Sequence, residues 1–220
     1  MLRESTFSEQ KSRTPFTFLR SWWFWIPLVY GVGVLGMLSP HKDLFLKITP
    51  FQLIGTAIVL LAYHNGIRRI EVVFFILCAL IGFLVEVVGV QTGLIFGNYQ
   101  YGSTLGFSVA GVPLTIAVNW FIMVYITGWG FRLIMREFQP LVGALMMTGI
   151  DVIIEQVAPK LDFWAFAGEN VPVQNYIAWF VIGYGLHFLG GRMGVRFHSK
   201  TAPMVFASMF GFFLLLKYCL

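Results

Sequence analysis

Apolar runs long enough to cross a membrane recur along almost the whole chain. From about residue 21 onward the sequence is built of runs near 18 residues with few charges, and a helix needs roughly 20 such residues to span a bilayer. Hydrophobic residues make up 58% of the 220-residue sequence and charged residues 11%, whereas an average soluble domain carries roughly 25% charged residues. This pattern excludes an ordinary soluble protein and predicts a polytopic helix bundle.

We predict an all-α membrane fold of about seven transmembrane helices. The predicted spans, in chain order, are 21–39, 48–64, 71–90, 111–131, 139–158, 173–190 and 202–219. Residues 1–20 form a polar tail, and 21–220 form one transmembrane domain without an internal repeat. The tail resembles the basic start of a secretory signal, but the run that follows is long and other spans come after it, so we expect an uncleaved first helix.

The basic residues divide unequally between the two sides of this arrangement. Of the 15 lysines and arginines, eleven fall in the tail and in the loops after the second, fourth and sixth spans, and four fall on the other side. Cytoplasmic segments of membrane proteins are enriched in these residues, so we expect a cytoplasmic N-terminus and an external C-terminus. The net charge of +5 therefore indicates topology and contact with lipid rather than binding of nucleic acid.

Carboxylic acids lie inside the predicted spans. Glu86 is near the outer end of the third span, and Asp151 and Glu155 are in the outer half of the fifth, four residues apart and thus on one helix face. Asn119 and Asn175 fall at a similar depth. Buried acids are costly and mark functional sites, although a single one can also be a hydrogen-bonding contact between helices, and Glu155 can be merely interfacial. We expect a polar cluster open to the outer side, in which at least one acid keeps its proton near neutral pH.

Residues typical of metal, disulfide or nucleotide sites are scarce. Cys78 and Cys219 provide no disulfide framework, and His64 and His187 show no metal-ligand spacing, so we expect interfacial or hydrogen-bonded histidines. The sequence contains no Walker loop, GxSxG elbow or dinucleotide fingerprint. The glycines of GVGVLG at 31–36 lie within a span, where small residues favour helix packing. We therefore predict no metal and no cofactor.

The connection at 91–110 is uncharged and rich in glycine, and it carries Tyr99 and Tyr101. Glycine permits positive φ and close backbone approach, so a structured re-entrant loop over the polar cluster is one interpretation. An ordinary turn with aromatic anchors at the interface is the other.

The stretches EVVGVQTGLIFGNYQYGSTLG, GVPLTIAVNW, APKLDFWAF and VPVQNYIAW, which fall between residues 86 and 180, resemble the bacterial and archaeal carotenoid biosynthesis membrane-protein family. That family includes hydratases of the acyclic end of γ-carotene or bisanhydrobacterioruberin. The resemblance implies an enzyme in the inner membrane of a prokaryote, a carotenoid substrate, and other enzymes of the pathway as partners. Aromatic candidates for substrate contact are Tyr99, Tyr101, Trp120, Trp164 and Trp179.

The reaction that this resemblance implies is the hydration of an unactivated terminal alkene, and its chemistry suggests a mechanism. A carboxylic acid would protonate C2, and water would capture the tertiary cation at C1, which makes the enzyme a cofactor-independent lyase. Our hypothesis is that Asp151 donates the proton while Glu86 or Glu155 orients the water. In the same hypothesis Asn119 and Asn175 fix the water, and Tyr99 or Tyr101 faces the cation.

Two other functions stay open at this stage. The first is a carotenoid or isoprenoid end-group cyclase or prenyl-transfer enzyme, although the two aspartate-rich motifs of membrane prenyltransferases are absent. The second is a small transporter or pigment-binding protein without enzymatic activity. A retinal-type photoreceptor would need a lysine in the middle of the last span, whereas Lys217 lies three residues from the end of the sequence.

Overall fold

Seven α-helices account for most of the computed structural model, which describes residues 22–128, 138–168, 170–197 and 199–220. Each helix coincides with one predicted span. The helices are α1 (Trp22–Met37), α2 (Lys42–Ala62), α3 (Arg69–Thr92), α4 (Thr115–Gly128), α5 (Gln139–Ile154), α6 (Val173–Arg192) and α7 (Ala202–Cys219). The predicted tail at 1–20 and the end of the fourth predicted span lie outside the described residues.

Four short strands and a 3-10 helix add a small cap that the all-α prediction did not include. They are β1 (Tyr99–Tyr101), β2 (Ser108–Val109), β3 (Val112–Pro113), β4 (Trp164–Phe166) and η4 (Ala158–Leu161). β2 and β3 form a hairpin whose turn has positive φ at Ala110 and Gly111, as a tight hairpin turn requires. β1 pairs antiparallel with β4. The glycine-rich connection is therefore a structured loop.

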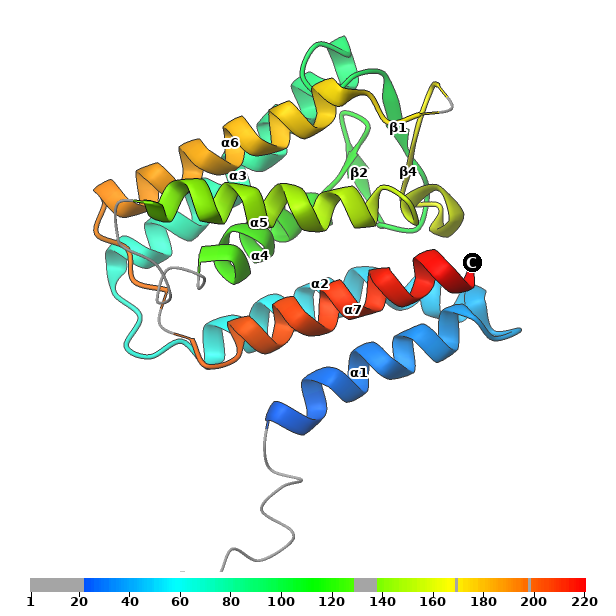
Figure 1. Ribbon diagram of the computed structural model, residues 1–220, viewed down its shortest axis with the longest axis horizontal. Helices are drawn as coiled ribbons and strands as arrows, with labels where there is room; N and C mark the ends of the chain where they lie inside the picture. The colour runs from blue at the N-terminus through cyan, green and yellow to red at the C-terminus, as the bar shows by residue number, and fades with distance from the viewer. Residues whose placement is uncertain (1–21, 129–137, 169, 198) are drawn as a thin grey trace, which may run out of the picture.

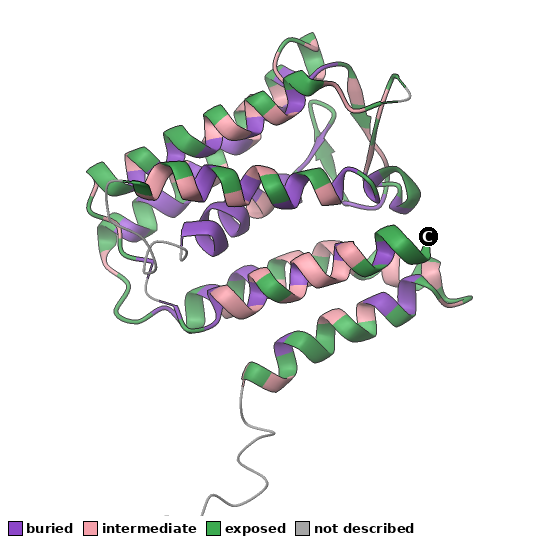
Figure 2. Cartoon of the chain, in the orientation of Figure 1, coloured by how far each residue is buried: buried purple, intermediate pink, exposed green. Residues whose placement is uncertain are grey.

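The helices pack as adjacent pairs (Figure 1). α5 lies against α6, α3 against α4, and α1 against α7 at the edge of the molecule. α4 is the central helix, and every residue from Trp120 to Gly128 is buried. The outer helices carry many exposed residues (Figure 2). Large apolar side chains are numerous among them, as expected where a surface faces lipid.

Helix length and composition bear on the number of spans. Among the described helices, α2, α3 and α7 are long and apolar enough to cross a membrane, and α1, α4 and α5 are shorter apolar helices. α6 has 20 residues but is not in this group, since polar side chains such as Asn175 and His187 interrupt it. The structure is thus a helical bundle typical of a membrane protein, while seven spans and a cytoplasmic N-terminus remain predictions.

Three predicted helix boundaries are wrong by several residues. α4 begins at Thr115 rather than at 111, because β3 takes up Val112–Pro113. α2 begins at Lys42 rather than at 48, because Pro50 lies inside the helix instead of starting it. α5 ends at Ile154, and Glu155 caps it, before the chain enters η4 at Ala158. Pro159 has no backbone N–H, and inside an α-helix its ring would clash with the carbonyl of Glu155, four residues earlier, which explains the early end.

Loops predicted on the same side of the membrane also lie at the same end of the bundle. The Lys42 ammonium donates to the backbone oxygen of Lys160 at 2.8 Å, which joins the start of α2 to η4. At the opposite end, the Arg68 guanidinium donates to the backbone oxygen of Gly194 at 2.6 Å. The bundle therefore has one end built by η4 and the strands and one end rich in arginine.

Candidate active site

Glu86 is fixed in the bundle by three hydrogen-bond donors. It lies on α3, six residues before the end of the helix, and is 4% exposed. Its Oε2 atom accepts hydrogen bonds from the hydroxyl groups of Tyr99 and Tyr101, the second at 2.7 Å. Its Oε1 atom accepts from Trp120 Nε1 on α4 at 3.1 Å. A buried acid with these donors has a defined orientation.

The pairing of β1 with β4 places both tyrosines over Glu86. Side chains two residues apart in a strand lie on the same face, so Tyr99 and Tyr101 point to the same side. They pair with Phe166 and Trp164 of β4 respectively. Burial and the neighbouring Glu86 carboxyl raise the pKa of both tyrosines above the ordinary value, so their hydroxyls remain protonated donors.

Asp151 and Glu155 are joined by one asparagine, as their spacing of four predicts. Asn175 Nδ2 on α6 donates to Asp151 Oδ2 at 3.0 Å and to Glu155 Oε1 at 3.2 Å. Trp164 Nε1 on β4 donates to Glu155 Oε2 at 2.9 Å. Both acids are buried, so the Glu155 carboxyl is enclosed by other side chains rather than exposed at the surface of the bundle.

A small chamber separates Glu86 from Glu155. Its volume is about 20 Å³, which is enough for roughly one water molecule. The chamber is lined by Glu86, Phe96, Tyr99, Tyr101, Ile116, Asn119, Glu155, Trp164, Phe166, Asn175 and Trp179. Asp151 is not in the lining. Its Oδ2 atom is bonded to Asn175, and its Oδ1 atom is buried without a hydrogen-bond partner among the described residues.

Aromatic rings form most of the remaining wall. Trp120 and Trp179 stack with centroids 4.5 Å apart and planes 6° from parallel. Tyr101 and Trp164 meet edge to face at 6.0 Å. Trp120 is fully buried behind Trp179, so of the three tryptophans predicted to contact substrate, only Trp164 and Trp179 face the chamber.

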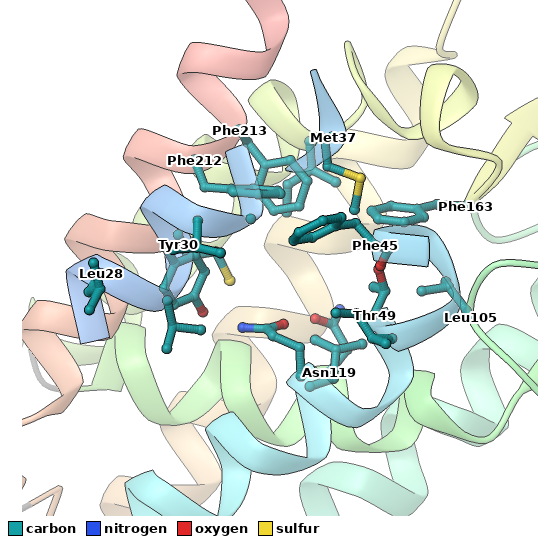
Figure 3. A pocket seen from close by; sticks show the side chains of 18 of the residues that line it. Leu28, Tyr30, Met37, Phe45, Thr49, Leu105, Asn119, Phe163, Phe212 and Phe213 are labelled. Atoms are coloured by element: carbon teal, nitrogen blue, oxygen red, sulfur yellow. The ribbon is translucent and has the colours of Figure 1, made fainter. Parts of the chain in front are cut away.

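A much larger apolar cavity adjoins the chamber. It has a volume of about 380 Å³, within the range of small-molecule sites, and is enclosed mainly by α1, α2, α4 and α7 (Figure 3). Its polar side chains are few, and Figure 3 shows Asn119 and Thr49 among rings such as Phe45 and Phe163.

Three residues line both spaces, namely Ile116, Asn119 and Trp164. They form the wall between the apolar cavity and the two acids. The side chain of Asn119 has no hydrogen bond to any described residue. A carboxamide in this place is available to bind a ligand or a water molecule.

The abundant aromatic residues are compatible with an apolar cavity, but the sequence could not place it, because its walls come largely from helices whose only evident property is hydrophobicity. Ile116 was also missed, although its spacing of three from Asn119 puts both on one helix face. Two of the three glycines at 31–36, Gly33 and Gly36, pack closely against other helices, as predicted, whereas a Cβ on Gly31 would have no neighbour within 4 Å. A Cβ on Gly36 would lie 2.3 Å from the Phe45 ring, and one on Gly33 would lie 3.1 Å from the Phe212 ring.

The two internal histidines belong to the arginine-rich half of the bundle. His64 Nδ1 is 2.6 Å from the Tyr125 hydroxyl, and His64 Nε2 is 3.3 Å from Glu71 Oε2. His187 Nε2 is 3.1 Å from Thr127 Oγ1. Both histidines thus join helices by hydrogen bonds, as expected. Across the described parts of the chain, no three His, Cys, Asp or Glu side chains converge in a way that suits a metal ion.

Comparison with known proteins extends the resemblance beyond its central part. A family model described as "Carotenoid biosynthesis protein" matches residues 48–218, which run from within α2 to the end of α7 but one residue. The bisanhydrobacterioruberin hydratase of Haloarcula japonica is 27% identical in an alignment of 216 residues, which covers 87% of this chain and 73% of that protein. No solved structure matches the chain.

Proposed function

Because the chain belongs to the carotenoid biosynthesis protein family, we propose that it adds water across the terminal C1–C2 double bond of an acyclic carotenoid end. One observation carries the proposal. An apolar cavity suited to an isoprenoid chain ends at a chamber with room for about one water molecule between two carboxyl groups. The name of the relative from Haloarcula japonica supports the same reaction.

In this proposal the end of the carotenoid lies at the wall shared by the two spaces. The polyene occupies the apolar cavity, and its terminal double bond passes between Ile116 and Trp164 toward the acids. Because the polyene leaves lipid rather than water, close packing against the apolar side chains of the cavity supplies the binding energy. Asn119 holds the attacking water or the new hydroxyl group.

Glu155 is the proposed proton donor. Its proton forms the new C2–H bond as the π bond breaks, which leaves a tertiary cation at C1. The faces of Trp164, Trp179 and Tyr101 stabilise this cation, since aromatic rings attract cations by about 0.5 to 2 kcal/mol. Glu155 is chosen over Asp151 because it lines the chamber and Asp151 does not.

Glu86 is the proposed base. Water bonds to C1 through its oxygen atom, and Glu86 accepts the proton that the oxygen loses. Three hydrogen bonds to Glu86 leave capacity for one more partner, since an ionised carboxylate offers about four acceptor sites. After the reaction Glu86 is protonated and Glu155 is not. A water molecule that refills the chamber then relays the proton from Glu86 to Glu155. Asp151 is a positioning residue that orients Asn175.

Pigment analysis tests the reaction and the assignment together. We expect Glu155→Gln and Glu86→Gln to lower hydration by about a hundredfold to ten-thousandfold in cells that make lycopene or γ-carotene, the usual contribution of a positioned acid or base. Asp151→Asn should lower it less, and Asp43→Asn, an exposed change on α2, should not affect it. The readout is chromatography with mass detection of the hydrated pigment. Unchanged hydration in both glutamate variants would refute the assignment.

The alternatives give different products in the same experiment. A cyclase would yield an isomer without any change of mass, and a transporter or pigment-binding protein would leave the pigment unaltered. The chamber favours hydration, because it suits water rather than a closing ring. The same proposal places the enzyme in a prokaryotic inner membrane, in contact with lipid and with other enzymes of its pathway.

A further inference from the structure

One stripe of α1 borders the apolar cavity and also faces the outside of the bundle. Trp25, Val29 and Val32 line the cavity, and each is about half exposed, at 50%, 50% and 48%. Ile48 on α2 lines it from the other side and is 44% exposed. Side chains that line a cavity and are also exposed on the outer surface lie at the opening of that cavity. Within the described residues, the cavity therefore opens between α1 and α2.

The other stripe of α1 is held in place. A Cβ on Gly33 would meet the Phe212 ring of α7 at 3.1 Å, and the Tyr30 ring lies edge to face with Phe212 at 6.0 Å. Near the turn to α2, Gly36 continues the stripe of Val29 and Val32, and there it packs closely on Phe45 of α2. α1 is thus fixed to α7 and to the start of α2, and these contacts frame the opening without filling it.

We infer that this opening is a lateral entrance through which one end of the carotenoid passes from the hydrocarbon layer of the membrane into the site. The inference rests on the proposed function. The rim is apolar, so a polyene moving through it exchanges lipid for side chains and never crosses water. The path is continuous, because the cavity reaches Asn119 and Trp164 at the edge of the reaction chamber.

A lateral entrance determines how many ends of a long substrate can react in one binding event. One end lies in the site while the rest of the polyene extends through the opening into the bilayer. The two ends of a symmetric acyclic carotenoid therefore react in separate binding events. The singly hydrated pigment is released before its second end is bound.

Obstruction of the opening tests the entrance directly. The purified protein and its variants would be placed in lipid vesicles that contain lycopene, and the initial rate of hydration measured. We expect the Val29→Trp/Ile48→Trp double variant to lose at least tenfold in rate. The matched controls are Leu35→Trp on α1 and Ile58→Trp on α2, which are 71% and 60% exposed and do not border the cavity. These controls should stay within twofold of the unaltered protein.

The results separate the entrance from the reaction. If the unaltered protein hydrates lycopene and the Val29→Trp/Ile48→Trp variant does so at the same rate, the proposed entrance is contradicted. The proposed reaction would still stand. No hydration by the unaltered protein would overturn the reaction itself, and the entrance with it. Val29→Ala/Ile48→Ala widens the same opening and should hydrate at least as fast as the unaltered protein. A tenfold loss in that variant would mean that these side chains bind substrate, which would overturn the entrance.

A time course tests the separate binding events. With lycopene in excess, the singly hydrated pigment should accumulate to many times the amount of enzyme before the doubly hydrated pigment forms. Doubly hydrated pigment in the first turnover, without free intermediate, would contradict the inference.

Discussion

Tyr101 contributes a stabilising contact that depends on pH. Burial and the nearby Glu86 and Tyr99 raise its pKa well above the ordinary value of 10.0. A group whose pKa is raised on folding contributes its full stability below the pKa of the unfolded chain and loses it as pH rises through the folded pKa. The Tyr101 contribution should therefore be complete at pH 8 and decline above about pH 10.

We predict that Tyr101→Phe lowers the thermal unfolding midpoint in detergent at pH 8, because a hydrogen bond to a charged group is worth about 1.5 to 3 kcal/mol. The difference from the unaltered protein should stay constant up to about pH 10 and narrow above it. Tyr218→Phe changes an exposed residue near the C-terminus and serves as the control. Parallel pH curves for Tyr101→Phe and the unaltered protein would argue against this contribution.

Much of the acid cluster can be predicted from single residues. Glu86, Asp151, Glu155 and Asn175 stand out because polar groups inside apolar segments are costly and need partners, and three of the four share hydrogen bonds through Asn175. The orientation of each side chain is not predictable in this way. The hypothesis that Tyr99 or Tyr101 faces a cation did not include the hydrogen bonds of both hydroxyls to Glu86, which depend on the register of two paired strands.

The crossing of α3 and α4 depends on a glycine. A Cβ on Gly82 of α3 would lie 2.1 Å from the ring of Trp120 on α4, whose indole nitrogen donates to Glu86. Gly82→Ala should therefore shift Trp120 and cost about 1 to 3 kcal/mol through overpacking. We expect a lower unfolding midpoint and at least a tenfold loss of the proposed hydration.

Gly55→Ala is the matched control for this helix contact. Gly55 lies inside α2, and a Cβ there would have no neighbour within 4 Å. Alanine favours helix over glycine by about 0.5 to 1 kcal/mol, so this variant should be as stable as the unaltered protein or slightly more stable. Equal effects of both substitutions on the unfolding midpoint would show that helix propensity, not the Trp120 contact, decides the outcome.

Apolar runs predict the helices well but not the elements between them. A run of membrane length leaves little choice but a helix, since backbone groups must be bonded within the segment. The strands β1 and β4 have three residues each and come from distant parts of the chain, so no local period marks them. The apolar cavity cannot be predicted from the sequence either, because it depends on which apolar helix faces are not in contact with one another.

The whole bundle has two chemically distinct ends, which makes its orientation testable. If the N-terminus is cytoplasmic, Lys160 in η4 faces outward and Lys200, in the loop before α7, faces the cytoplasm. Cysteines introduced at Lys160 and Lys200, in a chain with Cys78→Ala and Cys219→Ser, should differ in intact cells. A membrane-impermeant thiol reagent should label Lys160→Cys at least tenfold faster. The reverse order would invert the topology, and equal labelling only after permeabilisation would place both loops inside.

The small volume between Glu86 and Glu155 bears on the choice of nucleophile. A cation at C1 reacts with whatever lone pair reaches it first, and in open solvent an alcohol competes with water. A space of about 20 Å³ admits roughly one water molecule and leaves little room for the added methyl group of methanol. In the proposed hydration, the chamber would therefore act as a size filter that favours a tertiary alcohol over an ether.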